Sequence, residues 1–171
     1  LWTLDALWWE VLRKEEGEPA EGGEVLVGEA ERTTFRLERH LHDFLVDNWE
    51  MTALGRDWQI YSEAGDETAG YEYPTAVGRI DILAKHKTKP GWLVIELKGN
   101  RASDQVVGQL LRYMGWVKRH LAKPNDEVQG MIITPEIDEN LRYALVAVKG
   151  QGITLMRYRV EFHLESAEGV A

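Results

Sequence analysis

The chain contains the stretch Gly78-Arg79-Ile80-Asp81-Ile82-Leu83, and fifteen residues after Asp81 comes Glu96, within the apolar run Trp92-Leu93-Val94-Ile95-Glu96-Leu97-Lys98. Residues i and i+2 of a β-strand share one face. In the second stretch this period places Glu96 and Lys98 side by side on one face, while aliphatic side chains fill the other. The pattern predicts a buried strand whose last residues bring an acid and a base together.

The run from Val77 to Ala84 also predicts a central strand, because it is apolar on both faces except at Arg79 and Asp81. Burying carboxylates among aliphatic side chains is unfavourable unless they are paired or coordinate an ion. Two carboxylates beside a lysine suit a hard cation such as Mg²⁺, which takes oxygen ligands. The alternative is a buried ion pair of Asp81 with Lys98 and a solvent-exposed Glu96, an arrangement that stabilises a core poorly. The sequence therefore favours a metal centre.

A helix is predicted from Ser103 to Leu121, with Ser103 as its N-cap. Its apolar positions at helical spacing are Val106, Leu110, Tyr113, Met114, Val117 and Leu121. Gln109 and Tyr113 are four residues apart and so share one face. Because this helix follows the Glu-Leu-Lys strand directly, it would pack over the acidic residues and could aim both polar groups at them. A core tyrosine and a surface glutamine are the alternative.

An earlier helix is predicted from about Thr33 to Asn48. One stripe of this helix, at positions i, i+4, i+7, i+8 and i+11, is apolar except at its end and consists of Leu37, Leu41, Phe44, Leu45 and Asn48. Glu38 lies at the margin of this stripe, so it could point inward toward a metal held by the strand carboxylates; a solvated glutamate on the helix flank is the alternative. His40 and His42 are expected to be surface residues, since the chain has no His and Cys set with zinc spacing.

These motifs together resemble a known family. The strand with Asp81, the strand ending in Ile95-Glu96-Leu97-Lys98 and the segment Gln109-Leu110-Leu111-Arg112-Tyr113 look like the PD-(D/E)XK nuclease superfamily, and within it the catalytic domain of NucS-type (EndoMS-like) endonucleases. The likeness covers about residues 32 to 162. It implies a Mg²⁺- or Mn²⁺-dependent endodeoxyribonuclease that acts on branched, mismatched or single-stranded DNA in repair or processing.

The resemblance also implies a ligand set for the metal. Asp81 and Glu96 would bind the ion, helped by the main-chain carbonyl of Leu97. The family often has an acidic residue on the first helix of its core, and Glu38 is the candidate in this chain.

Three further roles are implied at positions that match the family motif. Lys98 would position or activate the attacking water and offset the charge that develops on the phosphate. Gln109 would orient that water or a ligand. Tyr113 would contact a phosphate or brace its helix.

The chain departs from the family pattern in two places. A basic stretch is expected after Lys98, but Gly99-Asn100-Arg101-Ala102-Ser103-Asp104 stands there. NucS-type proteins also carry a separate N-terminal domain that binds DNA and dimerises, and the 31 residues before this core are too few to form one. Substrate preference is therefore not transferred with the chemistry.

The predicted architecture is an α/β sandwich, a restriction-endonuclease-like core with a mixed β-sheet flanked by helices, in the order αβββαβ plus a C-terminal helix and strand. The elements not yet named are strands at 57–62, 128–134 and 152–164, a polar loop at 65–73 beside the site, and a helix at 138–148. The last strand is expected to be a half-buried edge, with Met156, Tyr158 and Val160 pointing inward.

Length and composition fit one nuclease domain at 32–171, because 171 residues with 44% hydrophobic content can bury a core without disulfides. Residues 1–31 are expected to form a Trp-rich helix at 1–12 and an acidic Glu/Gly linker. Such a helix must bury its tryptophans, either by docking on its own domain or by forming a homodimer with a second copy, and binding to another partner is the remaining alternative. Cysteine is absent, which excludes a thiol nucleophile. The sequence also lacks a signal layout or a membrane-spanning run, so an intracellular protein with no membrane partner is expected.

The net charge of −9 is concentrated at the start of the chain, where residues 1–31 hold nine acidic and two basic residues. The rest is nearly neutral, so a local basic groove for DNA remains compatible with the low isoelectric point. The candidate phosphate contacts are Arg79, Arg101, Arg112, Lys118, Arg119, Lys123, Arg157 and Arg159. Two alternatives stay open: a non-catalytic nucleic-acid-binding or assembly module on this fold, and a restriction-type nuclease that reads a short sequence.

Overall fold

The computed structural model describes residues 38–160, which form one six-stranded mixed sheet between helices. The strands in sheet order are β1 (Trp58–Ile60), β3 (Gly78–His86), β4 (Gly91–Leu97), β5 (Glu127–Thr134) and β6 (Ile153–Arg157), and β2 (Tyr71–Thr75) pairs beside them with β3. The pairs β1–β3, β2–β3 and β3–β4 are antiparallel, whereas β4–β5 and β5–β6 are parallel. The predicted mixed sheet is confirmed.

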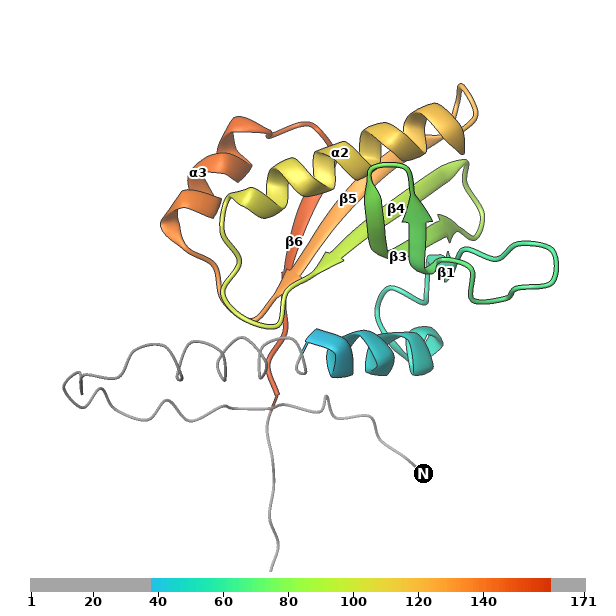
Figure 1. Ribbon diagram of the computed structural model, residues 1–171, viewed down its shortest axis with the longest axis horizontal. Helices are drawn as coiled ribbons and strands as arrows, with labels where there is room; N and C mark the ends of the chain where they lie inside the picture. Colours follow the sequence, from blue (N-terminus) through green and yellow to red (C-terminus); the bar gives the residue numbers. More distant parts are fainter. Residues whose placement is uncertain (1–37, 161–171) are drawn as a thin grey trace, which may run out of the picture.

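Helices cover both faces of this sheet (Figure 1). Helix α2 (Gln105–His120) connects β4 to β5, and α3 (Glu139–Ala147) connects β5 to β6. Parallel neighbours require such crossovers, and both helices lie over the same face. The helical segment 38–47 lies on the opposite face and leads into a short 3₁₀ helix, η1 (Trp49–Met51).

Two apolar clusters form the core, one on each side of the sheet. The cluster under α2 contains Leu83, Trp92, Val94, Val106, Leu110, Val117 and Leu141. The cluster under the helical segment 38–47 contains Trp49, Ile82, Ala84, Leu93, Ile95 and Ile133, with Leu41 and Leu45 packed against it. All seven residues of β4 are buried, because this strand is covered on both faces and paired on both edges.

The structure differs from the sequence prediction at one strand. Residues 71–73, expected in a polar loop, belong to β2, so four strands rather than three precede α2. Strand β2 contains Pro74, and Glu72 has a positive φ of 47°, so its local sequence favours a strand weakly. It is held by pairing with β3 from Tyr71↔Ile82 to Thr75↔Gly78.

Two smaller predictions are wrong. Helix α2 begins at Gln105, after Asp104 rather than Ser103, and Asp104 makes no side-chain capping bond. The described part of the last strand ends at Arg157. Met156 is exposed while Leu155 packs into the core, so the inward position expected of Met156 is wrong, whereas Tyr158 does pack against the core cluster on the other side of the sheet. As an edge strand it pairs only with β5, as predicted.

The Trp-rich helix and acidic linker predicted for residues 1–31 lie outside the described residues, as does the end of the last strand beyond residue 160. Within residues 38–160, none of the helices has the length and apolar character needed to cross a membrane.

Candidate active site

The site lies where two adjacent strands separate. Pairing of β3 with β4 ends at Ile82↔Ile95. Beyond that pair, β3 continues beside β2, while Glu96 and Leu97 continue beside β5. Asp81 and Glu96 are therefore the first residues past the last pair, one on each strand. The Asp81 side chain spans the separation, because its Oδ2 accepts a hydrogen bond from the Leu97 main-chain N–H at 2.7 Å.

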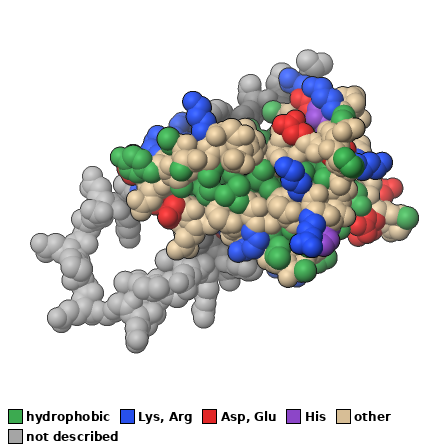
Figure 2. All heavy atoms as spheres, turned by 90° about the horizontal axis from the view of Figure 1, so that it is seen from above, with side chains coloured by type: hydrophobic (Ala, Val, Ile, Leu, Met, Phe, Trp, Pro, Cys, Tyr) green, Lys and Arg blue, Asp and Glu red, His purple; other side chains and the backbone are tan. Residues whose placement is uncertain are grey.

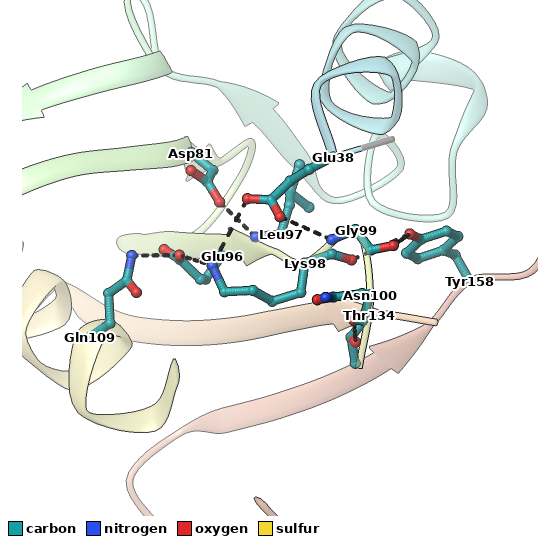
Figure 3. Close-up of polar contacts among 10 residues, drawn as sticks. All are labelled: Glu38, Asp81, Glu96, Leu97, Lys98, Gly99, Asn100, Gln109, Thr134 and Tyr158. Atoms are coloured by element: carbon teal, nitrogen blue, oxygen red, sulfur yellow. Dashed lines mark hydrogen bonds and ion pairs between the residues drawn. The ribbon is translucent and has the colours of Figure 1, made fainter. Parts of the chain in front are cut away.

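Glu96 is 1% exposed and is the centre of a polar network (Figure 3). Its Oε1 accepts hydrogen bonds from Lys98 Nζ at 2.8 Å and from Gln109 Nε2 at 2.5 Å. Its Oε2 is buried and has no hydrogen-bond partner among residues 38–160. The alternative of a buried Asp81–Lys98 ion pair with Glu96 in solvent is wrong, since Lys98 pairs with Glu96 and Glu96 is buried.

Glu38 approaches the end of β4 from the helical segment 38–47, on the face of the sheet opposite α2. Its Oε2 accepts a hydrogen bond from the Gly99 main-chain N–H at 3.0 Å, and its Oε1 lies 4.0 Å from Lys98 Nζ. In Figure 3 the side chains of Glu38, Asp81 and Lys98 point toward one another around the end of β4. The inward orientation expected of Glu38 is what the structure shows, rather than a fully solvated glutamate.

Crowding of buried carboxylates alters the ionisation of the site. Burial raises the pKa of Asp81, against the opposing effect of the Leu97 N–H. Burial, followed by the charge of Asp81, raises the pKa of Glu96 to about 7. Burial lowers the pKa of Lys98, but Glu96, Glu38 and Asp81 together outweigh it, so this pKa lies above its ordinary value. The arrangement holds one cation among three carboxylates that repel one another.

The donor set fits a hard divalent cation. Asp81 and Glu96 offer carboxylate oxygens, the ligands that Mg²⁺ and Mn²⁺ prefer. Oε2 of Glu96 is buried without a partner, and an unsatisfied buried oxygen is costly unless something binds it. Within residues 38–160, no three His, Asp or Glu side chains form a ready-made metal-binding group. Lys98, Gln109 and main-chain N–H groups hold the carboxylates in position.

Tyr113 is a predicted site residue that packs within the apolar core under α2. It is buried, and its hydroxyl lies against Gly78, where an added Cβ would come within 2.6 Å of it. Gly78 also has a φ of 129°, a conformation that favours glycine. The guanidinium of Arg112 lies 5.3 Å from the centre of the Tyr113 ring. These contacts suit a residue that braces α2 against β3, whereas a phosphate contact stays a prediction.

Two residues at the site were missed in the sequence. His42, expected on the surface, is 6% exposed, and its Nε2 donates a hydrogen bond to the main-chain oxygen of Asp81 at 2.7 Å. Tyr158 donates to the main-chain oxygens of Lys98 or Gly99, at 3.3 and 3.2 Å. His42 is four residues after Glu38, so their shared helix face was a usable signal; Tyr158 had none.

The basic residues proposed as phosphate contacts are dispersed. Arg79 pairs with Glu72 at 2.8 Å, and Arg101 pairs with Glu136 at 3.2 Å. Figure 2 shows lysine and arginine side chains scattered over the visible face rather than gathered in one band. This arrangement is consistent with the acidic net charge of the sequence, −9.

Comparison with known families gives a match over most of the described part. The model of the endonuclease NucS C-terminal domain matches residues 40–161. Endonuclease NucS 2 of Halobacterium salinarum is 30% identical over 149 residues, which cover 76% of this chain and 56% of that protein. Endonuclease NucS of Methanocaldococcus jannaschii is 36% identical over 75 residues, 44% of this chain and 27% of that protein. The chain thus spans from about a quarter to about half the length of these relatives.

A solved structure described as an EndoMS–dsDNA2 complex has the same fold. It superimposes with a TM-score of 0.51 at 16% sequence identity and covers 89% of this chain and 51% of that one. At this identity the likeness concerns the fold.

Proposed function

The chain belongs to the family of endonuclease NucS C-terminal domains, and on that premise we propose that it is the nuclease part of a metal-dependent DNA endonuclease acting in repair. The observation that carries the proposal is the separation of β3 from β4, which leaves the partly buried carboxylate of Asp81, the buried carboxylate of Glu96 and a lysine past the last strand pair. The unpartnered Oε2 of Glu96 supports a cation at this position.

Asp81 and Glu96 would hold Mg²⁺ or Mn²⁺, with the main-chain carbonyl of Leu97 as a third donor and Glu38 as a fourth. When bound, the ion supplies positive charge at the scissile phosphate and makes a water molecule easier to deprotonate. The residues of the chain then fix geometry and charge. The Leu97 N–H holds one oxygen of Asp81, and Gln109 and Lys98 hold Oε1 of Glu96, which leaves Oε2 for the ion.

Lys98 supplies the mobile positive charge of the site. Its ammonium group sits among three carboxylates and stays protonated at neutral pH, since its pKa is raised. It therefore acts as a hydrogen-bond donor that positions water and offsets the charge developing on the phosphate during in-line attack. Gln109 holds Glu96 in a single orientation, and its amide can also orient a ligand.

DNA is the proposed partner, and the solved complex with the same fold is described as containing double-stranded DNA. We propose mismatched, branched or single-stranded DNA as the preferred substrate, on the strength of the family likeness. Because the basic residues are dispersed, non-specific affinity should be modest, and it should fall with salt in proportion to the number of phosphates that are contacted. Homodimerisation through the Trp-rich N-terminal segment stays a prediction about residues outside the described part.

The test uses the full 171-residue chain. Labelled single-stranded, duplex, mismatched and flapped oligonucleotides are incubated with Mg²⁺, Mn²⁺ or EDTA. The native chain is compared with Asp81→Ala and Lys98→Ala. Lys87→Ala is the matched control, because Lys87 lies at the opposite end of β3, where it pairs with Glu50 at 2.7 Å.

Cleavage that requires metal, survives in Lys87→Ala and is lost in the two site variants is the expected result. The preferred oligonucleotide then identifies the substrate class. DNA binding without cleavage of any substrate would overturn the proposal in favour of a non-catalytic binding module. Cleavage that follows a short sequence, whatever the DNA structure, would favour a restriction-type nuclease.

A further inference from the structure

A buried histidine holds the main chain of Asp81. Nε2 of His42 donates to the Asp81 carbonyl oxygen at 2.7 Å, so this nitrogen carries the proton, because a carbonyl oxygen can only accept. The His42 ring stacks on Tyr71 with ring centres 4.2 Å apart. The Tyr71 hydroxyl in turn donates to Oδ1 of Asp43 at 2.6 Å. Through these contacts, His42 and Asp43 of the helical segment 38–47 are linked to Asp81 of β3 and Tyr71 of β2.

We propose that His42 is a positioning residue that fixes Asp81 for metal binding; this inference rests on the nuclease function proposed above. Asp81 is held at both ends, since His42 binds its carbonyl group and the Leu97 N–H binds its carboxylate. Held in this way, the carboxylate has little freedom to turn away from Glu96. No other hydrogen bond in residues 38–160 ties a side chain of that helical segment to β3.

The hydrogen bond between His42 and Asp81 also fixes how far Glu38, on the helical segment, lies from Asp81, on β3. Glu38 lies one helical turn before His42, and its carboxylate reaches Gly99 just past β4. A shift of the helical segment would therefore displace Glu38 relative to Asp81. The backbone opposite Asp81 is also constrained, because Glu72 has a φ of 47°, which is costly for a residue with a side chain beyond Cβ.

Two substitutions separate positioning from packing. His42→Phe keeps an aromatic ring that can stack on Tyr71 and removes the N–H donor. His42→Gln keeps a side-chain N–H at similar reach and removes the ring. If His42 acts by positioning Asp81, Phe is the damaging change and Gln recovers function. If His42 only fills space, Gln is the damaging change and Phe is tolerated.

The experiment is a calorimetric titration of the full chain with Mn²⁺, followed by thermal unfolding without metal. Partners that orient a metal ligand typically contribute about 10- to 100-fold in affinity. We expect His42→Phe to weaken Mn²⁺ binding by that range and His42→Gln to stay within about threefold of the native chain. His86→Phe is the control, because His86 also lies on β3, at the end that pairs with β1, and should leave Mn²⁺ affinity unchanged.

The outcomes distinguish the two proposals. The role of His42 alone would be overturned if His42→Phe bound Mn²⁺ as tightly as the native chain while Asp81→Asn did not bind it. Absence of Mn²⁺ binding by the native chain would overturn the metal-dependent function, and the role of His42 with it. If His42→Phe fails to fold, His42→Gln decides, since affinity more than about tenfold below native would overturn the inference.

Discussion

The two ends of the β3–β4 pair differ in what they bury. At the paired end, Ile82 to Lys85 face Trp92 to Ile95 in a continuous ladder, and aliphatic side chains fill both sides of the sheet. At the separated end, one residue further along each strand, the side chains are the partly buried Asp81 and the buried Glu96. The same two strands thus carry the core at one end and the candidate chemistry at the other.

This difference follows from where pairing stops. A strand that leaves its neighbour opens space for side chains between them, and polar groups can meet there without breaking the apolar layers. Charges buried at this point destabilise the protein unless they find partners. Stability should therefore depend on the paired end and activity on the separated end, and substitutions at the two ends should affect different measurements.

The largest effect is expected for Asp81→Asn at the separated end. The amide cannot replace a carboxylate as an ion ligand, and loss of one preorganised charge interaction can cost about 10³-fold, or about 4 kcal/mol of transition-state stabilisation. Because a buried charge disappears, the free energy of unfolding should be unchanged or higher. Cleavage assays and urea unfolding on the same sample measure both. A variant that loses activity through unfolding would contradict the comparison.

At the paired end, Leu93→Ala should do the reverse. Leu93 is fully buried in the cluster under the helical segment 38–47, and a Leu→Ala change in such a place costs about 3 kcal/mol. Activity per folded molecule should stay near the native value at temperatures where the variant is folded. Met51→Ala is the control, because Met51 is mostly exposed and should change stability by less than about 0.5 kcal/mol.

The pH dependence of stability should also come from the separated end. Glu96 has a pKa of about 7 in the folded chain against an ordinary value of 4.5, so the folded state binds its proton more tightly than the unfolded state. The resulting stabilisation is complete below about pH 4.5 and is lost as pH rises to about 7.

In EDTA, the free energy of unfolding of the native chain should therefore fall between pH 5 and 8, by about 2 kcal/mol more than that of Glu96→Gln. The pKa of Asp81 is also raised by burial and acts in the same direction, and because the two carboxyl groups interact, the difference reports on the Asp81–Glu96 pair. Parallel curves for the two proteins would mean that Glu96 titrates normally. Added Mn²⁺ should restore stability at pH 8, because a ligand of the folded state stabilises it by mass action.

The paired end could be predicted from local pattern, whereas parts of the separated end could not. Alternation along 92–98 predicted β4 and set Glu96 beside Lys98, and the helical period predicted α2 and put Gln109 within reach of Glu96. Each of these contacts lies within one strand or between β4 and the helix that follows it in the chain. Strand β2 was missed because Pro74 disfavours a strand and because the pairing with β3 that holds it is a long-range contact. The positive φ of Glu72 shows that its backbone departs from regular strand geometry.

His42 was missed for a related reason. A helix pattern read from apolar residues treats a histidine as polar and assigns it to the surface. The group that it binds, the carbonyl of Asp81, is 39 residues away in the chain. The helix face shared with Glu38 could have indicated that His42 points toward the site, but a main-chain acceptor leaves no trace in the sequence, so the contact itself is revealed by the packing of the helical segment against β3.

The smallest effect is expected for Tyr158→Phe, which tests how far the separated end depends on its surroundings. Tyr158 stays neutral, because burial raises its pKa to about 12, and its hydroxyl makes long hydrogen bonds to the carbonyls that follow β4. Loss of such a bond should cost less than about 1 kcal/mol of stability. Tyr73→Phe is the matched control, since its hydroxyl bonds Glu63 at a similar 3.3 Å.

Tyr158→Phe should lower kcat several-fold with little change in KM, because the carbonyls that it holds belong to Lys98 and the residue after it. Tyr73→Phe should lower stability by a similar amount and leave kcat unchanged. Equal kcat values in the two variants would show that the backbone after β4 keeps Lys98 in place without Tyr158. The chemistry would then depend only on the strand separation itself and on the contacts of Asp81 and Glu96.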